Sequence, residues 1–198
     1  MEETTMKSTL NFGCIGYGFM GKTHVSNILK HPKADIKAIY TQPNAPVETE
    51  KRQGLENVEI YTDDWKEMIS REDLDAVVVA SPTHTHAEIA RFAAQNNKHI
   101  FVEKPMARTI EGADSMIEAA KVNGVRLFVG HVLRFFQAFS QAKASLDQEA
   151  TDIGDVKMIR GLRYSTLPNW SKWFFNEKKS GGCILDLSIH DIDYAMWI

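Results

Sequence analysis

Long apolar runs are missing from the sequence. None approaches the length that crosses a bilayer, and the polar first eight residues lack the apolar core of a secretory signal. Cysteine is scarce as well, because only Cys14 and Cys183 are present, too far apart in sequence for a metal-ligand spacing. One falls in an apolar run and the other at a glycine-rich helix start. We therefore expect buried free thiols, a reducing cytoplasmic location and no membrane partner.

The sequence also lacks a surplus of charge of one sign. Its formal net charge is −3, which leaves no basic footprint for nucleic acid. Internal repeats and low-complexity tracts are absent, whereas 43% of the 198 residues are apolar and 25% are charged, as in ordinary globular proteins with a real core. This length allows one large domain, or one domain followed by part of a second.

Short apolar runs alternate with helical patterns over the first 130 residues. The run at 75–80 is apolar almost throughout, which is typical of a strand in the middle of a parallel sheet with both faces covered. The alternation of strands with helices predicts an α/β fold built on a doubly wound parallel sheet. Its strands are expected at 10–15, 36–40, 58–61, 75–80, 100–102 and 125–129.

The pattern changes beyond residue 130. Residues 136–150 are predicted to be helical, and partial alternation at 156–164 predicts a longer antiparallel strand of a second layer. Residues 181–193 predict a further, mostly buried helix. We expect this part of the chain to begin an α+β domain.

Three glycines lie between the first predicted strand and the first helical pattern. In such a context the spacing of Gly16, Gly18 and Gly21 is typical of dinucleotide binding. The first glycine permits a tight turn, the second lets a pyrophosphate approach the backbone, and the third allows close packing of helix on strand. The following helix offers its free N–H groups to the anion. Phe19 and Met20 belong to the same predicted cofactor-binding turn.

The second predicted strand ends without the acidic residue that dinucleotide sites carry about 20 residues past the glycines to bind the ribose hydroxyls. Thr41 stands there instead. No carboxylate repels a 2′-phosphate at this place, and no arginine binds one unless Lys51 or Arg52 folds back. The sequence therefore leaves NAD and NADP open.

An acid, a base and a proline follow the predicted strand 100–102 directly. Such a strand end lies at the edge where open α/β sheets bind ligands, and Pro105 favours an extended Lys104, so the ammonium is held at that edge. Glu103 and Lys104 are therefore candidate site residues. The alternative is a surface ion pair followed by a turn proline.

Asp186, His190 and Asp193 fall on one face of the last predicted helix. An aspartate one turn from a histidine can orient the imidazole for proton transfer. The alternative is a structural hydrogen bond that satisfies a buried histidine. A metal site would need a third ligand, for which the sequence offers no good candidate, so we expect none.

Together these blocks resemble the Gfo/Idh/MocA oxidoreductases, the family of glucose–fructose oxidoreductase and inositol dehydrogenase. The matching blocks occur in family order and extend from about residue 10 to the end. They are Gly16 to Gly21, Ser81-Pro82-Thr83 with His86, Glu103-Lys104-Pro105, Gly181-Gly182 with Asp186, His190 and Asp193, and more loosely Gly130-His131 with Arg134-Phe135.

The resemblance implies an NAD(P)-dependent oxidoreductase that transfers a hydride between nicotinamide and a secondary alcohol or ketone of a sugar, inositol or related polyol. Lys104 would lie beside the nicotinamide and the substrate hydroxyl, and His190 would be the proton acceptor with Asp186 contacting the substrate or the histidine. The Lys104–Pro105 bond becomes a candidate cis peptide. The cofactor-binding residues implied are Gly16, Gly18, Phe19, Met20, Gly21, Thr41, Ser81, Pro82, Thr83, His86, Glu103 and Lys104.

The resemblance also divides the chain. It implies a Rossmann-type dinucleotide-binding domain over 1–130 and an incomplete substrate and oligomerisation domain over 131–198, with a homo-oligomer as the full-length form. Family members are usually much longer, so we expect a fragment. Cys183 and Ser188 also depart from the family by replacing glycines. A non-catalytic NAD(P)-binding regulator on the same scaffold is the alternative function, and a methyltransferase ranks below it.

Overall fold

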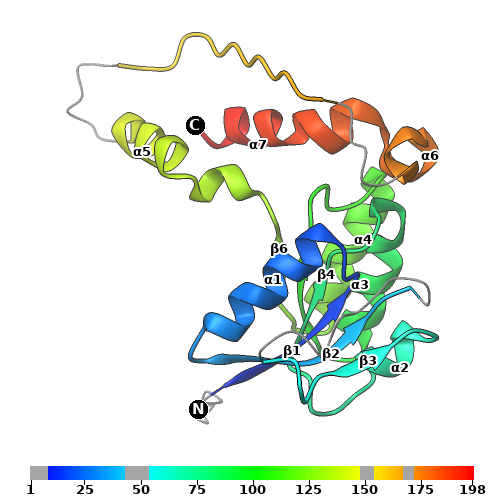
Figure 1. The fold of residues 1–198 in the computed structure, drawn as a ribbon. Coiled ribbons are helices and arrows are strands. Elements are labelled where there is room, and N and C mark those ends of the chain that lie inside the picture. Colours follow the sequence, from blue (N-terminus) through cyan, green and yellow to red (C-terminus); the bar gives the residue numbers. More distant parts are fainter. Residues whose placement is uncertain (1–8, 43–53, 148–153, 167–171) are drawn as a thin grey trace. The chain divides into compact units, whose positions relative to one another are not determined.

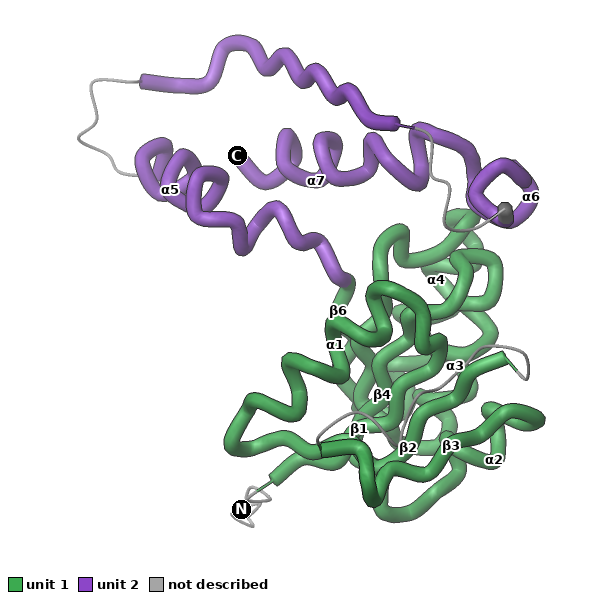
Figure 2. The backbone as a smooth tube through the Cα atoms, in the orientation of Figure 1, with its two compact units in different colours: residues 1–129 green, residues 130–198 purple. Residues whose placement is uncertain are grey.

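The computed structural model describes residues 9–42, 54–147, 154–166 and 172–198. The chain divides into two compact units, residues 1–129 and 130–198 (Figure 2). Among the helices of the described ranges, none combines the length and apolar character needed to cross a membrane.

The first unit is a six-stranded parallel sheet flanked by helices (Figure 1), which confirms the predicted fold class. The strand order is β3-β2-β1-β4-β5-β6, a doubly wound arrangement that reverses direction next to β1. The strands are β1 (Leu10–Ile15), β2 (Ala34–Tyr40), β3 (Glu59–Tyr61), β4 (Ala76–Val79), β5 (His99–Val102) and β6 (Leu127–Val129). The helices are α1 (Phe19–Lys30), α2 (Trp65–Ile69), α3 (His86–Gln95) and α4 (Ile110–Val122).

Strand β4 is buried on both faces, as its continuous apolar run predicts. Val78 packs in one core cluster with Val25 of α1, while Val77 and Val79 pack in another with residues of α2, α3 and α4. Helix α1 therefore covers one face of the sheet, and the other three helices cover the opposite face. Both clusters of buried apolar residues found in the described ranges belong to this unit.

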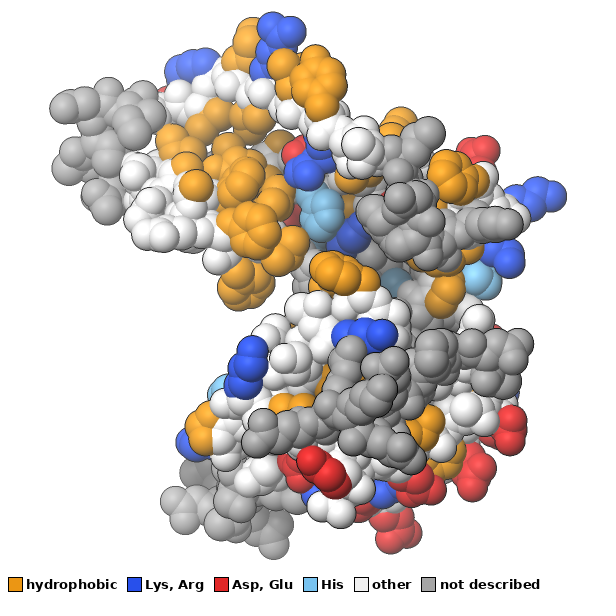
Figure 3. Space-filling model, viewed as in Figure 1, with side chains coloured by type: hydrophobic (Ala, Val, Ile, Leu, Met, Phe, Trp, Pro, Cys, Tyr) orange, Lys and Arg blue, Asp and Glu red, His pale blue; other side chains and the backbone are white. Residues whose placement is uncertain are grey.

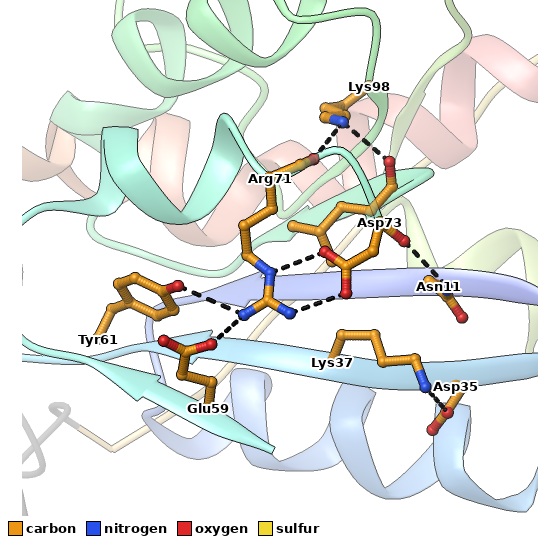
Figure 4. A network of polar contacts seen from close by, with 9 residues as sticks. Asn11, Asp35, Lys37, Glu59, Tyr61, Arg71, Asp73 and Lys98 are labelled. Carbon is orange, nitrogen blue, oxygen red and sulfur yellow. Dashed lines mark hydrogen bonds and ion pairs between the residues drawn. The ribbon is translucent and has the colours of Figure 1, made fainter. Parts of the chain in front are cut away.

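A polar network ties the strands together near the amino ends of β4 and β5 (Figure 4). Arg71 donates to both carboxylate oxygens of Asp73, at 2.8 Å each, and also bonds Glu59 and the Tyr61 hydroxyl. The Arg71 guanidinium lowers the pKa of the Asp73 carboxyl below its usual value. Lys98 is 7% exposed and donates to the backbone oxygens of Arg71, at 2.6 Å, and Leu74, at 2.9 Å. These contacts fix the segment that leads into β4.

Replacing Lys98 with methionine is expected to lower the free energy of unfolding of this unit by about 2–3 kcal/mol, because two carbonyl oxygens lose a charged donor. Lys37→Met is the control, since its ion pair with Asp35 at 2.6 Å is partly solvent-exposed and contributes at most about 1 kcal/mol. Denaturant unfolding followed by circular dichroism measures both changes. Equal losses in the two variants would show that the buried ammonium has no special stabilising effect.

The second unit contains η3 (Val132–Phe135), α5 (Gln137–Leu146), η4 (Lys172–Phe175), α6 (Glu177–Ser180), a π-helical turn (Ile184–Ser188) and α7 (Ile189–Trp197). None of the residues of α5 is buried. Figure 3 shows apolar side chains gathered at the surface of this unit. Phe135 and Met196 are each 83% exposed.

The antiparallel strand predicted at 156–164 is wrong. Residues 154–166 are exposed and form no regular secondary structure. A strand needs a neighbouring strand for its backbone hydrogen bonds, and the described residues of this unit provide none. Arg163 instead donates to both carboxylate oxygens of Asp191 in α7, at 2.6 and 2.7 Å, which lowers the pKa of that carboxyl. The side-chain pair, not a backbone ladder, holds the segment to the helix.

The two cysteines differ in their surroundings. Cys14 lies in β1 and is buried, which raises the pKa of its thiol to about 12 and keeps it protonated. Cys183 is exposed just before the π-helical turn, so the prediction of a buried thiol is wrong there. Cys183 stands at the start of a short helical turn, and no sheet or helix of the described residues covers its side chain.

Candidate active site

The loops that follow β1, β4 and β5 begin level with one another at the carboxyl edge of the sheet. Backbone N–H groups of Ala80 and Glu103 donate to the last residues of the neighbouring strands, Ile15 and Val79, at 2.8 and 2.9 Å. The loops after β1, β4 and β5 therefore lie next to one another where they leave the sheet. Doubly wound sheets bind their ligands at this edge, close to the reversal of strand order.

The glycine turn after β1 is shaped by close backbone contacts. Gly16 has φ +92°, and a Cβ there would lie 2.6 Å from the Ala80 carbonyl oxygen. A Cβ on Gly21 would lie 1.9 Å from the Gly16 carbonyl oxygen. Both positions therefore require glycine for the turn and for the packing of α1 on β1, as the motif predicts.

Gly18 differs from both, because no heavy atom lies within 4 Å of the point where its Cβ would stand. It is the N-cap of α1, and the first turn of that helix carries no acidic residue. Phe19, at 80% exposure, and Met20 begin the helix. Free N–H groups at a helix N-terminus attract anions, and the open backbone at Gly18 leaves room for one. These residues fit the pyrophosphate of a dinucleotide.

The loop after β4 is held by its own hydroxyl groups. Ser81 and Thr85 share a hydrogen bond between their hydroxyls at 2.7 Å, and Thr85 also donates to the Pro82 carbonyl oxygen at 2.8 Å. Thr83 is buried at the start of a short 3-10 helix. The loop is thus rigid, with Ser81 and Pro82 half-buried beside the glycine turn.

His86 joins this loop to the one after β5. Its Nε2 lies 2.8 Å from the Ser81 carbonyl oxygen and its Nδ1 lies 3.0 Å from that of Pro105. The ring is 1% exposed, and burial lowers the pKa of His86. The histidine sets the distance between the two loops.

The loop after β5 carries Lys104. Its Lys104–Pro105 peptide bond is cis, as the family resemblance implies. Glu103 is buried, and its Oε2 accepts the Lys104 backbone N–H at 3.2 Å. Its Oε1 lies 2.6 Å from Nε2 of His24 on α1. Lys104 itself is half-buried.

His24 is a residue that the sequence analysis missed. Its position three residues after Gly21, on the helix that the glycine motif opens, is the signal that could have drawn attention to it.

Thr41 directly follows β2 and is buried, with its backbone N–H donating to the Tyr61 carbonyl oxygen at 3.0 Å. It stands where an acidic residue would bind the ribose hydroxyls. The alternative cations for this place, Lys51 and Arg52, lie outside the described residues.

The remaining candidates belong to the second unit. Asp186 lies in the π-helical turn and His190 in the first turn of α7. A π-helical turn departs from the 3.6-residue period on which the predicted shared face rests. Asp193 is held by Arg134, which donates to its two oxygens from Nε at 2.9 Å and from Nη2 at 2.6 Å, while His131 Nδ1 lies 3.5 Å from it.

The structure therefore brings the glycine turn, the Ser81 loop and Lys104 to one edge of the first unit, and places Asp186 and His190 in the second. No group of three histidine, cysteine or acidic side chains in the described ranges could hold a metal ion.

Comparison with known proteins agrees with this geometry. Residues 10–131 match the model of an oxidoreductase family with an NAD-binding Rossmann fold, and residues 139–198 match the GFO/IDH/MocA C-terminal domain. A levoglucosan dehydrogenase of Pseudarthrobacter phenanthrenivorans is 34% identical over 96% of this chain and 51% of its own. The scyllo-inositol 2-dehydrogenase (NAD(+)) of Bacillus subtilis is 30% identical over 98% and 55%.

Among solved structures, scyllo-inositol dehydrogenase from Lactobacillus casei with bound NAD(H) and scyllo-inositol is 32% identical, with a TM-score of 0.79 over 96% of this chain and 56% of that one. The chain spans about half the length of the curated relatives it matches. The family matches cover both units, so the chain belongs to the Gfo/Idh/MocA family of oxidoreductases.

Proposed function

We propose that this chain carries the cofactor-binding domain, over residues 1–130, and the beginning of the substrate domain, over 131–198, of a dehydrogenase. The enzyme oxidises a secondary alcohol of a sugar, an inositol or a related polyol. Relatives named as levoglucosan and inositol dehydrogenases support this substrate class. The proposed full-length form is a cytoplasmic homo-oligomer that binds no nucleic acid.

One observation carries the proposal. The open backbone at Gly18 and the amine-bearing residue Lys104 leave the same edge of the sheet, from β1 and β5, with only β4 between them. A dinucleotide that rests its pyrophosphate at the start of α1 extends along this edge. Lys104 then stands where the reacting end of the cofactor and the substrate hydroxyl meet.

We propose NAD(H) as the cofactor in preference to NADP(H). The B. subtilis relative is named for NAD(+), and the L. casei structure holds NAD(H). When bound, the cofactor supplies the nicotinamide carbon that exchanges a hydride with the substrate carbon. The N–H groups at the start of α1 bind the pyrophosphate, and the rigid Ser81 loop borders the cofactor.

The chain's own residues then handle the proton. His190 accepts the proton of the substrate hydroxyl at its imidazole, and the Lys104 ammonium donates a hydrogen bond to the same oxygen. Asp186 orients either the substrate or the His190 ring.

Calorimetric titration of this chain with NADH, NADPH and S-adenosylmethionine tests the cofactor part. We expect one site that binds NADH more tightly than NADPH, and no heat from S-adenosylmethionine. A form that includes the rest of the substrate domain, given NAD and a panel of inositols and sugars, is expected to produce NADH absorbance with at least one of them. Failure to bind either nicotinamide cofactor contradicts the proposal, and binding without turnover on any polyol favours the regulator.

A further inference from the structure

His24 lies on the second turn of α1, the helix that begins at the glycine turn. Its ring contacts Phe101 of β5 edge to face, with centroids 4.9 Å apart. Its side chain is 19% exposed. The ring thus packs against the sheet, with Nε2 directed to the loop that follows β5.

The partner of that nitrogen is Glu103, whose side chain is 11% exposed. Nε2 of His24 lies 2.6 Å from Oε1 of Glu103, and Oε2 accepts the backbone N–H of Lys104 at 3.2 Å. A carboxylate only accepts hydrogen bonds, so His24 is the donor and carries its hydrogen on Nε2. One carboxylate thus connects the helix to the backbone of the lysine.

The same loop is held from the other face of the sheet. His86 of α3 contacts the Pro105 carbonyl oxygen at 3.0 Å, whereas His24 reaches Glu103 from α1. Helices α1 and α3 pack on opposite faces of the sheet. Lys104 lies between these two anchor points in the sequence, so a change at either one shifts its backbone.

We propose that His24 is a positioning residue for Lys104, acting through Glu103. The inference rests on the proposed function in one respect only, that the position of the Lys104 amine matters for turnover. It adds a physical link between the glycine turn at the start of α1 and the loop after β5 that carries Lys104. The helix that receives the pyrophosphate also orients the residue that faces the reacting end.

Two substitutions separate the hydrogen bond from the packing. His24→Phe keeps a ring against Phe101 and removes the donor, whereas His24→Gln keeps an N–H donor at the reach of Nε2 and removes the ring. If positioning is the role, phenylalanine disturbs Lys104 and glutamine largely restores it. If His24 only fills space, glutamine disturbs Lys104 more than phenylalanine does. Thermal unfolding of both variants then measures the stability lost with the ring packing.

The first readout needs no cofactor. Reductive methylation with formaldehyde, followed by mass spectrometry, measures the rate at Lys104, with the exposed Lys157 as an internal standard. We expect a rate change of about threefold or more at Lys104 in His24→Phe, none at Lys157, and a rate close to wild type in His24→Gln. Nitrogen-15 spectra of wild-type protein are expected to show the hydrogen of His24 on Nε2.

The second readout is kinetic, in a form that includes the rest of the substrate domain. His24→Phe is expected to lower kcat about ten- to a hundredfold with little change in KM, since misplacing a reacting group by about 1 Å has effects of that size. His24→Gln is expected to stay within about threefold of wild type.

Unchanged methylation of Lys104 in His24→Phe, or equal losses in both variants, would overturn the proposal. So would a His24 ring whose only hydrogen is on Nδ1. Failure of the wild-type chain to bind a nicotinamide cofactor would instead contradict the proposed function. The methylation comparison would still decide the role of His24.

Discussion

Replacing Gly18 with valine is expected to weaken binding of NAD(H) at least about a hundredfold while leaving the unfolding temperature close to wild type. The pyrophosphate is displaced by the side chain and loses hydrogen bonds to N–H groups, each worth about 1.5–3 kcal/mol when one partner is charged. The fold tolerates the change because no heavy atom lies within 4 Å of the new Cβ and the backbone φ at Gly18 is −78°. Calorimetry gives the dissociation constant and differential scanning fluorimetry the stability.

Gly21→Ala is the matched contrast within the same motif. Its Cβ would lie 1.9 Å from the Gly16 carbonyl oxygen, so α1 must move and the unfolding temperature falls. A motif that served only to fold the turn would make Gly18→Val behave in the same way. Unchanged affinity for NADH in a stable Gly18→Val variant would show that the glycine turn does not bind the cofactor.

Lys104→Met and His190→Gln are expected to lower turnover at least about a hundredfold each, in a form that includes the rest of the substrate domain. Positioned proton-transfer groups contribute about 10²–10⁴ in rate. The dissociation constant for NADH is expected to change less than about threefold, because the pyrophosphate contacts lie at the start of α1. Steady-state kinetics and calorimetry on the same preparations separate the two effects.

Lys121→Met is the control for loss of a lysine, since Lys121 is exposed near the end of α4. It is expected to keep wild-type turnover. Normal oxidation of the polyol by both Lys104→Met and His190→Gln would show that the proposed proton-transfer residues are wrong, even if cofactor binding is retained.

Much of the first unit could be predicted because its signals are local. The apolar run at β4 needs cover on both faces and therefore belongs in the middle of the sheet. The glycine spacing predicts a turn, and one of its close contacts, that of Gly21 with the Gly16 carbonyl oxygen, joins residues only five positions apart. Patterns of this kind depend little on the rest of the chain.

The failures concern features that depend on distant partners. The alternating pattern at 156–164 predicts a strand, but a strand needs a neighbour for its hydrogen bonds, and that need is invisible in the segment itself. The exposure of Cys183 likewise depends on what covers it. In the last helix, the π-helical turn at Ile184–Ser188 alters a spacing that the sequence analysis takes as regular.

The candidate site shows the same limit. The glycine turn and Lys104 are found from motifs, whereas His24 and Glu103 are 79 residues apart and meet only because α1 packs on the face of the sheet that carries Phe101. The motif points to Lys104 from the sequence alone, whereas the contact between His24 and Glu103 becomes visible only in three dimensions.

A crystal structure of this chain with NADH bound tests the central claim most directly. We expect pyrophosphate oxygens within hydrogen-bonding distance of the N–H groups at the start of α1, beside Gly18, and the nicotinamide next to Lys104. A dinucleotide bound away from the glycine turn, or one whose nicotinamide lies far from Lys104, would contradict the account.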